Sequence, residues 1–304
     1  MKVLITGANG FLGQHVTLYL AGKNYDVIAG NRGECRIAEK PSIQYYCADI
    51  TDKLAVASMI TAVQPDVVIH TAAMSKPDEC NNDKKTCHSV NVEATGFLVE
   101  SLRSVPHLQP HFIYISTDFI FGENGPHSED DIAAPLNFYG ETKLCAERLV
   151  TGSGLINTII RPVFIYGPML QGVRPSFLHW VKNNLEQNKK IKVVSDQQRT
   201  PTFVVDICRG IETIVTKKAQ GVYHLAGKDL LSPYQMAIAV ANFLDLDAAL
   251  IENVTSETFE EPVKRAKRSG LKIDKARRLL GYEPVSFEEG IQLTFNKDQY
   301  AYSA

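Results

Sequence analysis

Short apolar runs alternate with amphipathic stretches along the first half of the chain. The apolar runs predict strands at residues 2–6, 27–29, 43–47, 67–69, 112–115 and 158–160. Apolar residues recur at helical spacing between them, at residues 11–20, 54–63, 87–102 and 139–150. Strands that alternate with helices are typical of parallel βαβ units covered on both faces. We therefore predict an α/β fold with a doubly wound, Rossmann-type parallel sheet, whose ligands lie at the carboxyl ends of the strands.

The alternation stops after Gly167, where prolines and glycines predict a loop. Further elements are predicted at residues 176–187 (helix), 222–225 (strand), 232–244 (helix) and 273–280 (helix). We expect residues 1–167 to form a dinucleotide-binding domain and residues 168–304 to form mainly a smaller, mixed substrate lobe. Segments within residues 191–226 are expected to return to the main sheet.

Three glycines, Gly7, Gly10 and Gly13, separate the first predicted strand from the first predicted helix. A strand, a glycine turn and a helix N-terminus present backbone N–H groups and a positive dipole end to a pyrophosphate. The alternative is a tight strand–helix turn that binds nothing. We predict a dinucleotide cradle made of Gly7, Asn9, Gly10, Phe11, Leu12 and Gly13.

Tyr139 and Lys143 are four residues apart on a predicted helix and follow the strand that ends before Thr117. Residues at this spacing lie on one helix face. A free phenol has a pKa of about 10, and an ammonium about 4 Å away would lower it by roughly 3 units. We predict that Tyr139 is the catalytic acid, that Lys143 lowers its pKa and holds the nicotinamide ribose, and that Thr117 orients the substrate carbonyl.

A second pair with this spacing, Tyr19 and Lys23, lies toward the far end of the first predicted helix, away from the glycine turn. No chemistry is expected there. For Tyr139 and Lys143 the alternative interpretation is an ordinary surface pair beside a strand-end hydroxyl.

Composition narrows the class of protein. Hydrophobic residues make up 44% of the 304 residues, charged residues 22%, and the net charge is −2. This balance argues against nucleic-acid binding, and no apolar stretch approaches the ~20 residues of a membrane helix. The six cysteines form no C-x-x-C pair and no zinc-ligand spacing. We expect no metal, no signal peptide before a strand that starts at residue 2, and reduced thiols in the cytoplasm.

Three segments resemble the extended short-chain dehydrogenase/reductase family and, within it, the dTDP-4-dehydrorhamnose reductases. They are residues 6–13 (TGANGFLG), 116–122 (STDFIFG) and 139–143 (YGETK), and similar stretches cover most of the chain. The resemblance implies that Asp49 and Ile50 contact adenine and that Ala72 and Ala73 flank the nicotinamide half. It also implies active-site roles for Asn91, for which helix packing is the alternative, and for Arg161 at a strand end beyond the nicotinamide.

The segment after the second predicted strand bears on the cofactor. NAD-binding proteins place an acid there for the ribose hydroxyls, whereas NADP-binding proteins place a cation. Here Arg32 comes first and the first acid is Glu34. A guanidinium suits a 2′-phosphate, so NADP(H) is favoured over NAD(H); the alternative is a loop arginine that faces solvent.

The expected activity is an NADPH-dependent reduction of a 4-keto nucleotide sugar. Sugar-nucleotide dehydratases carry Asp-Glu after the threonine, whereas this chain has Asp118 and Phe119, which argues against dehydration. An NAD-dependent epimerase and a non-catalytic dinucleotide-binding regulatory subunit stay open, and a homodimer is compatible with the sequence. Five residues are the candidates for substrate contact: Thr117, Asp118, Arg174, Arg199 and Arg265.

Overall fold

A seven-stranded parallel sheet forms the centre of the computed structural model, which describes residues 1–37, 40–259 and 263–296. Its strand order is β10-β6-β5-β4-β1-β2-β3. The strands are β1 (Lys2–Thr6), β2 (Asp26–Asn31), β3 (Ile43–Cys47), β4 (Val67–His70), β5 (His111–Ile115), β6 (Ile156–Arg161) and β10 (Gly221–His224). The order reverses between β1 and β4, which is where a doubly wound sheet opens a crevice for ligands. The predicted fold class is confirmed.

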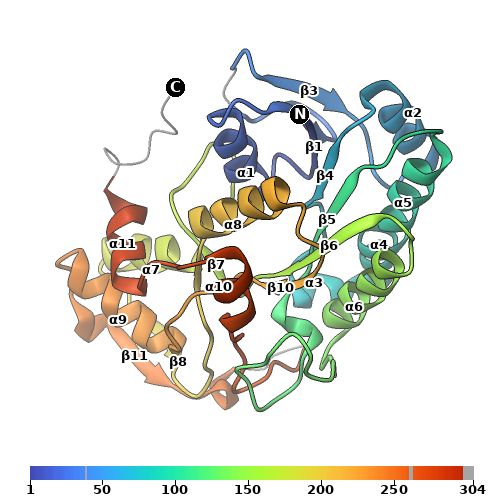
Figure 1. Cartoon of the computed structure of the whole chain (residues 1–304). Helices are drawn as coiled ribbons and strands as arrows, with labels where there is room; N and C mark the ends of the chain where they lie inside the picture. The colour runs from blue at the N-terminus through green and yellow to red at the C-terminus, as the bar shows by residue number, and fades with distance from the viewer. Residues whose placement is uncertain (38–39, 260–262, 297–304) are drawn as a thin grey trace.

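Helices cover both faces of this sheet (Figure 1). α1 (Phe11–Ala21) and α8 (Val204–Lys217) cover one face, and α2 (Lys53–Val63), α5 (Ala94–Ser104) and α6 (Phe138–Thr151) cover the other. Alternate residues of each strand point to opposite layers. Thus Ile5 packs under α1, whereas Leu4 packs under α2, and both are fully buried.

The predicted helix over residues 87–102 is interrupted. α4 (Lys84–His88) passes into a π-helical turn at Ser89–Glu93, and α5 follows. A short helix that the pattern did not indicate, α3 (Pro77–Asn82), precedes them. The π turn carries the buried Asn91. Its Oδ1 accepts from Met74 N, and its Nδ2 donates to Met74 O. Such turns are frequent at functional sites because they displace a side chain from the helical register.

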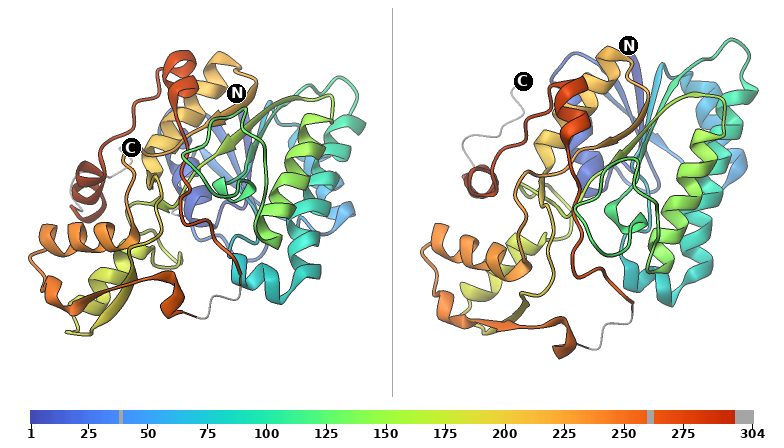
Figure 2. Two further views of the ribbon diagram at one scale, coloured as in Figure 1. Left: turned by 90° about the horizontal axis from the view of Figure 1, so that it is seen from below. Right: turned by 60° about the horizontal axis from the view of Figure 1, so that its bottom comes forward.

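The smaller lobe lies beside the main domain, below and to the left of the sheet in Figure 2. It contains α7 (Phe177–Leu185), α9 (Pro233–Phe243) and a parallel strand pair, β8 (Ile191–Val194) with β11 (Ile251–Val254). Between residues 191 and 226, β10 joins the main sheet and α8 packs on α1, whereas β8 stays in the lobe. The chain therefore crosses between the two parts more than once.

The remaining elements connect the two parts. β7 (Ile165–Tyr166) pairs with β9 (Thr202–Phe203). α10 (Asp274–Leu280) packs on β10 and α8, and α11 (Phe287–Phe295) packs on α9. In the described part of the chain, no helix combines the length and the apolarity needed to cross a bilayer.

Residues 263–272, which we call the crossing segment, run between the lobe and the main domain. On one side Gln198 N donates to Lys267 O at 2.7 Å. On the other side Gly125 N donates to Arg268 O, and His127 N donates to Gly270 O, each at 3.0 Å. The segment is therefore held from both sides by backbone hydrogen bonds.

Residues 168–172, the strap, lie across the N-terminal half of α1. Gln14 Nε2 donates to Gln171 O at 3.0 Å, and His15 Nε2 lies 3.1 Å from Pro168 O. Arg36, in the loop after β2, donates through Nη1 to Gly172 O at 3.0 Å. The strap therefore ties the start of the lobe to both the first helix and the loop after β2.

Candidate active site

The glycine turn between β1 and α1 is built by close approaches that larger residues would prevent. Gly7 has φ +75°, and a Cβ on it would lie 2.5 Å from Ala72 N. A Cβ on Gly13 would lie 2.2 Å from Gly7 O, so α1 can approach the turn only with glycine there. The tight turn and the close packing of the helix on the strand are two of the three reasons why a dinucleotide cradle needs glycine, and the helix N-terminus that follows suits a pyrophosphate.

Two adjoining hollows run along the carboxyl ends of the strands from this turn. The first, of about 220 Å³, is lined by Gly7, Gly10, Arg32, Asp49, Ile50, Ala72 and Ala73, among others. The second, of about 390 Å³, is lined by Gly10 to Gly13, Ser116 to Phe119, Tyr139 and Lys143, among others. Both hollows reach the glycine turn, because Gly10 lines each of them.

The first hollow carries one cation and one acid. Arg32 Nη1 lies 3.5 Å from Asp49 Oδ2, and the Arg32 side chain is 79% exposed. Hydrogen bonds from Thr51, more than the Arg32 charge, lower the pKa of Asp49. The guanidinium is therefore held by a weak surface pair, and most of its surface is exposed.

Asn9 was predicted to contact the cofactor, but its side chain is used within the protein. Its Nδ2 donates to Glu34 O at 2.8 Å, and its Oδ1 accepts from Arg36 N at 3.0 Å. Asn9 therefore fixes the loop after β2 against the glycine turn. Its amide shapes the cradle from behind.

Tyr139 stands at the start of α6, which the side chain of Asn137 caps by accepting from Gly140 N at 3.0 Å. Gly140 allows this helix to dock, because a Cβ there would lie 2.1 Å from Phe119 O. Phe119 packs edge-on against the Tyr139 ring, with centroids 5.5 Å apart. The sequence Tyr139-Gly140 thus places the phenol against the turn that carries Thr117.

Lys143 lies one turn further along α6 and is 2% exposed. Its Nζ donates to Ile115 O at 2.7 Å and lies 4.2 Å from the centroid of the Tyr114 ring. Burial lowers the pKa of Lys143 to about 7. The spacing therefore brings Tyr139 and Lys143 to one face, at the end of β5.

The expected lowering of the tyrosine pKa by the lysine is wrong for this structure. Burial raises the pKa of Tyr139, and the hydrogen bond with Thr117 offsets part of that rise. The physical reason is that Tyr139 is 6% exposed, so the cost of a desolvated phenolate is the largest effect.

Thr117 and Asp118 lie together at the turn after β5, and both line the second hollow. Thr117 Oγ1 donates to Asp118 Oδ1 at 3.3 Å. Asp118 Oδ2 accepts from Ser269 Oγ of the crossing segment at 3.0 Å. Burial raises the pKa of Asp118, whereas the Arg199 charge acts to lower it.

Asn91 does not line either hollow. Its amide bonds Met74 N and Met74 O, and its Nδ2 also donates to Thr142 Oγ1 at 3.1 Å. Thr142 lies on α6 beside Lys143. Asn91 therefore joins Met74, in the segment after β4, to α6.

The side chain of Arg161, which was predicted as a cofactor contact, is bound within the protein. Its guanidinium makes a two-point ion pair with Glu147 of α6, at 2.9 Å through Nε and 2.7 Å through Nη2. Both side chains are less than a tenth exposed. A buried arginine and glutamate each require a partner inside the protein, so the Arg161 side chain holds β6 to α6.

The three arginines predicted to bind the substrate are not brought together. Arg199 is 6% exposed and donates to Ala266 O and to Gln197 Oε1. Arg174 pairs with Glu79 at 3.2 Å, and Arg265 pairs with Asp78 at 2.6 Å. The Arg199 side chain is thus buried and bonded within the protein, while Arg174 and Arg265 lie at neighbouring acids of α3.

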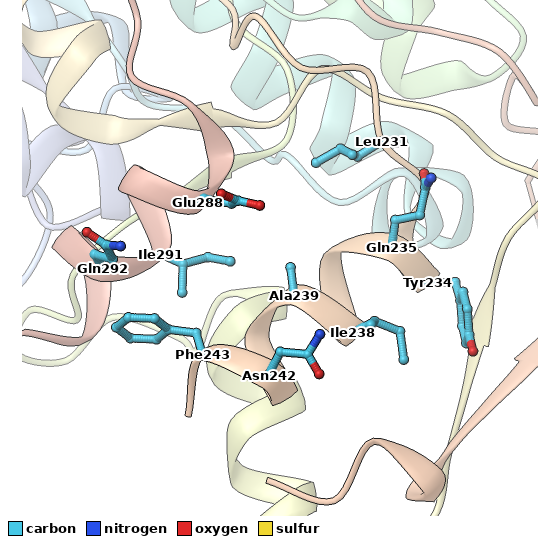
Figure 3. A pocket seen from close by; sticks show the side chains of 10 residues that line it. All are labelled: Leu231, Tyr234, Gln235, Ile238, Ala239, Asn242, Phe243, Glu288, Ile291 and Gln292. Atoms are coloured by element: carbon cyan, nitrogen blue, oxygen red, sulfur yellow. The ribbon is translucent and has the colours of Figure 1, made fainter. Parts of the chain in front are cut away.

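A separate hollow of about 580 Å³ lies between α9 and α11 (Figure 3). Tyr234, Ile238 and Phe243 line it from α9 and its C-terminal end, and Ile291 lines it from α11. Glu288 is the charged residue among those that line it. A diphosphate requires cations, so this hollow does not suit the anionic part of a nucleotide sugar.

Several residues that line the second hollow were not predicted as site residues: Ser75, Ser116, Phe119, Pro162, Phe164 and Ile165. Pro162 and Phe164 follow β6, so their position at the carboxyl end of a predicted strand was the available signal. Ser269 comes from the crossing segment, and nothing in its local sequence indicates that it reaches Asp118.

The family is decided by a match over nearly the whole chain. Residues 1–300 match the model of the RmlD substrate binding domain. The chain belongs to this family. A relative from Pongo abelii, "Methionine adenosyltransferase 2 subunit beta", is 31% identical over 274 residues, which are 88% of this chain and 78% of that protein. The "Spore coat polysaccharide biosynthesis protein SpsK" of Bacillus subtilis (strain 168) is 28% identical, over 96% of this chain and 95% of that one.

Solved structures agree with this family. A dTDP-4-dehydrorhamnose reductase of Clostridium acetobutylicum ATCC 824 has a TM-score of 0.86 and 28% identity, over 99% of this chain and 100% of that chain. The enzyme of Bacillus anthracis str. Ames, in complex with NADP, has a TM-score of 0.85 and 25% identity, over 97% and 99%. A UDP-glucuronic acid 4-epimerase of Bacillus cereus, in complex with UDP-glucuronic acid and NAD, has a TM-score of 0.84 and 25% identity, over 99% of this chain and 100% of that chain.

Fold and family together place the chain among the NAD(P)-dependent oxidoreductases of the extended short-chain dehydrogenase/reductase type, in a nucleotide-sugar reductase and epimerase group. A dinucleotide is the cofactor class of this group, and the glycine cradle fits it.

Proposed function

We propose that the protein is an NADPH-dependent reductase of a 4-keto nucleotide sugar. The observation that carries the proposal is the group formed by Thr117, Tyr139 and Lys143 at the end of the hollow that begins at the glycine turn. Phe119 stands where a dehydratase has its base, and it closes one side of the phenol. The family match and the reductase structures support the same class of reaction.

In this mechanism the bound cofactor supplies the hydride. Tyr139 donates its proton to the carbonyl oxygen as that oxygen becomes negative, and Thr117 keeps the phenol in place by their hydrogen bond. Lys143, fixed on Ile115 O, places a charge beneath the site where the phenolate forms. Phe119 and Phe164 restrict water at this end of the hollow.

NADPH is proposed over NADH because Arg32 lines the adenosine end of the first hollow and is mostly exposed. Arg32→Ala should raise the Kd of NADPH about tenfold or more while changing that of NADH little, because one charge-assisted hydrogen bond is lost. Arg278→Ala, on the exposed face of α10, is the matched control. Equal weakening of both cofactors would show that Arg32 does not bind the phosphate.

The direct test is oxidation of NADPH by the purified protein with dTDP-4-dehydrorhamnose. We expect turnover in the wild-type protein and its loss in Tyr139→Phe. A second assay with UDP-glucuronic acid and NAD tests for epimerisation. Activity in the second assay alone would replace reductase by epimerase as the function of this site.

A homodimer and a cytoplasmic location stay predictions. Light scattering tests the homodimer, and cell fractionation tests the location.

A regulatory subunit is the second candidate, and the names of the relatives near 30% identity favour it. Under this proposal the protein would change the activity of a methionine adenosyltransferase when mixed with it, and Tyr139→Phe would not matter. The presence of Thr117, Tyr139 and Lys143 in one hollow supports the reductase first.

A further inference from the structure

Asp118 links the catalytic turn to the crossing segment, and this contact has no role in the mechanism above. Ser269 Oγ donates to Asp118 Oδ2 at 3.0 Å, and Thr117 Oγ1 donates to Asp118 Oδ1 at 3.3 Å. All three side chains are less than a tenth exposed. One carboxylate therefore bonds the catalytic threonine with one oxygen and a serine from a distant part of the chain with the other.

We infer that Ser269 is a positioning residue of the active site. It acts through Asp118 to decide whether the Thr117 hydroxyl donates its proton to Asp118 or to Tyr139. The inference rests on the proposed reductase mechanism, in which Thr117 bonds Tyr139.

The threonine hydroxyl has a single proton to donate. Two acceptors lie around it, the Asp118 carboxylate and the oxygen of Tyr139. Phe119 N donates to the same hydroxyl oxygen at 3.3 Å, so backbone already occupies part of its acceptor capacity. Thr117 can thus assist a phenolate at Tyr139 only when Asp118 does not hold its proton.

Ser269 and Arg199 weaken the hydrogen bond that Asp118 accepts from the Thr117 hydroxyl. Ser269 satisfies one carboxylate oxygen directly, and the Arg199 charge stabilises the ionised carboxylate from within the protein. Without the serine, the desolvated carboxylate would depend on Thr117 for its remaining side-chain hydrogen bond. The threonine would then be held away from Tyr139 at the moment when the phenolate forms.

The position of Ser269 is itself well fixed. Its N donates to Gln198 O at 3.1 Å, and Arg199 Nη1 donates to Ala266 O at 2.9 Å in the same segment. On the other side, a Cβ on Gly125 would lie 2.9 Å from the carbonyl carbon of Ser269, so the two backbones are in close contact. A hydroxyl held this rigidly can orient a carboxylate at little further cost in entropy.

The test compares Ser269→Ala with Ser195→Ala, which removes a serine hydroxyl of the lobe that contacts Val254 O only weakly, at 3.4 Å. With dTDP-4-dehydrorhamnose and NADPH, kcat of Ser269→Ala should fall about tenfold, the usual size of one hydrogen bond. The KM values and the Kd of NADPH should not change. Ser269→Thr should recover most of the loss, and Ser195→Ala should behave as wild type.

Two further measurements separate positioning from a general structural effect. In a Thr117→Val background, Ser269→Ala should have no additional effect on kcat, because its route through the threonine is gone. Carbon NMR of the labelled Asp118 carboxyl, with no substrate present, should show that its pKa rises in Ser269→Ala.

An Asp118 pKa that is unchanged in Ser269→Ala would overturn the inference. So would a loss of kcat on Ser269→Ala that is as large in the Thr117→Val background as in the wild-type protein. A shifted titration with normal kcat would also overturn it, because the carboxyl would then not act on the threonine. If the wild-type protein oxidises no NADPH, the proposed function fails, and the NMR titration still decides whether Ser269 holds Asp118.

Discussion

Two Tyr-x-x-x-Lys pairs with the same spacing lie in very different surroundings. Tyr139 and Lys143 are 6% and 2% exposed, and the lysine bonds the end of a central strand. Tyr19 donates to Glu212 of α8 at 2.8 Å, and Lys23 lies over its ring at 5.8 Å at the surface. α1 ends at Ala21, so Lys23 lies beyond the helix that holds Tyr19, whereas α6 holds both Tyr139 and Lys143 on one face. Spacing alone therefore does not make the site, and the position of the pair at the start of a helix beside a strand end does.

The residue that follows each tyrosine explains part of the difference. Gly140 allows α6 to contact the backbone of Phe119, whereas Leu20 after Tyr19 is a buried core residue. Tyr19 therefore joins α1 to α8, whereas Tyr139 packs against the turn that carries Thr117.

The largest difference between the pairs should appear in turnover. Tyr139→Phe should lower kcat by about a thousandfold, because a positioned acid contributes roughly 10²- to 10⁴-fold. Tyr19→Phe should leave kcat unchanged. Steady-state kinetics with NADPH and dTDP-4-dehydrorhamnose measures both. Comparable losses in the two variants would remove the distinction between the pairs.

The second prediction concerns the glycine beside the catalytic tyrosine. Gly140→Ala should lower the free energy of unfolding by about 3 kcal/mol, because a Cβ 2.1 Å from Phe119 O forces α6 away from the turn. Gly96→Ala in α5, where a Cβ meets nothing within 4 Å, is the matched control. It should raise the free energy of unfolding by about 0.5–1 kcal/mol. Urea denaturation measures both changes, and a neutral Gly140→Ala would contradict the close contact.

The third prediction uses the buried lysine. Since burial lowers its folded pKa to about 7, the unfolded chain binds more protons than the folded one from there up to the ordinary lysine range. The free energy of unfolding should therefore rise with pH, by at most about 1.4 kcal/mol per pH unit, or roughly 2 kcal/mol between pH 7.5 and 9.

Lys143→Met should abolish this contribution to the slope, and Lys23→Met, on an exposed side chain, should keep it. Urea denaturation at several pH values, without cofactor, measures the slopes. Equal slopes for wild-type protein and Lys143→Met would show that the lysine is already solvated in the folded protein.

The smallest effect is expected for the structural tyrosine. Tyr19→Phe should lower the free energy of unfolding by about 1 kcal/mol or less, because it removes one half-buried hydrogen bond to Glu212. Glu212→Gln keeps an acceptor and should lose less. Chemical denaturation is sufficient for both. A loss as large as that of Gly140→Ala would mean that the α1–α8 contact depends on this bond.

The parts of the fold and site that were predictable are those fixed by local sequence. Strands such as 43–47 and the glycine turn follow from runs and spacings a few residues long, and parallel strands then bring their carboxyl ends to one edge. Thr117 reaches this edge for that reason, and the contact of Gly140 with Phe119 brings Tyr139 to it.

The rest depends on contacts between distant segments. Arg161 looked like a ligand residue at a strand end, but Glu147 of α6 reaches it across the fold. Arg199 looked like a loop cation, but the crossing segment covers it. A single sequence shows the charge of an arginine and does not show which carboxylate or carbonyl meets it.

The strap over α1 bears on any redesign of the loop after β2. Arg36, four residues after Arg32, bonds Gly172 O, and Gly172 has φ +69° with its Cβ position only 2.9 Å from Arg36 Cδ. A loop transplanted from a relative would have to supply its own partner for residues 168–172, or the strap would lose its bond to the loop after β2. A redesign therefore has to change the loop after β2 and the strap together.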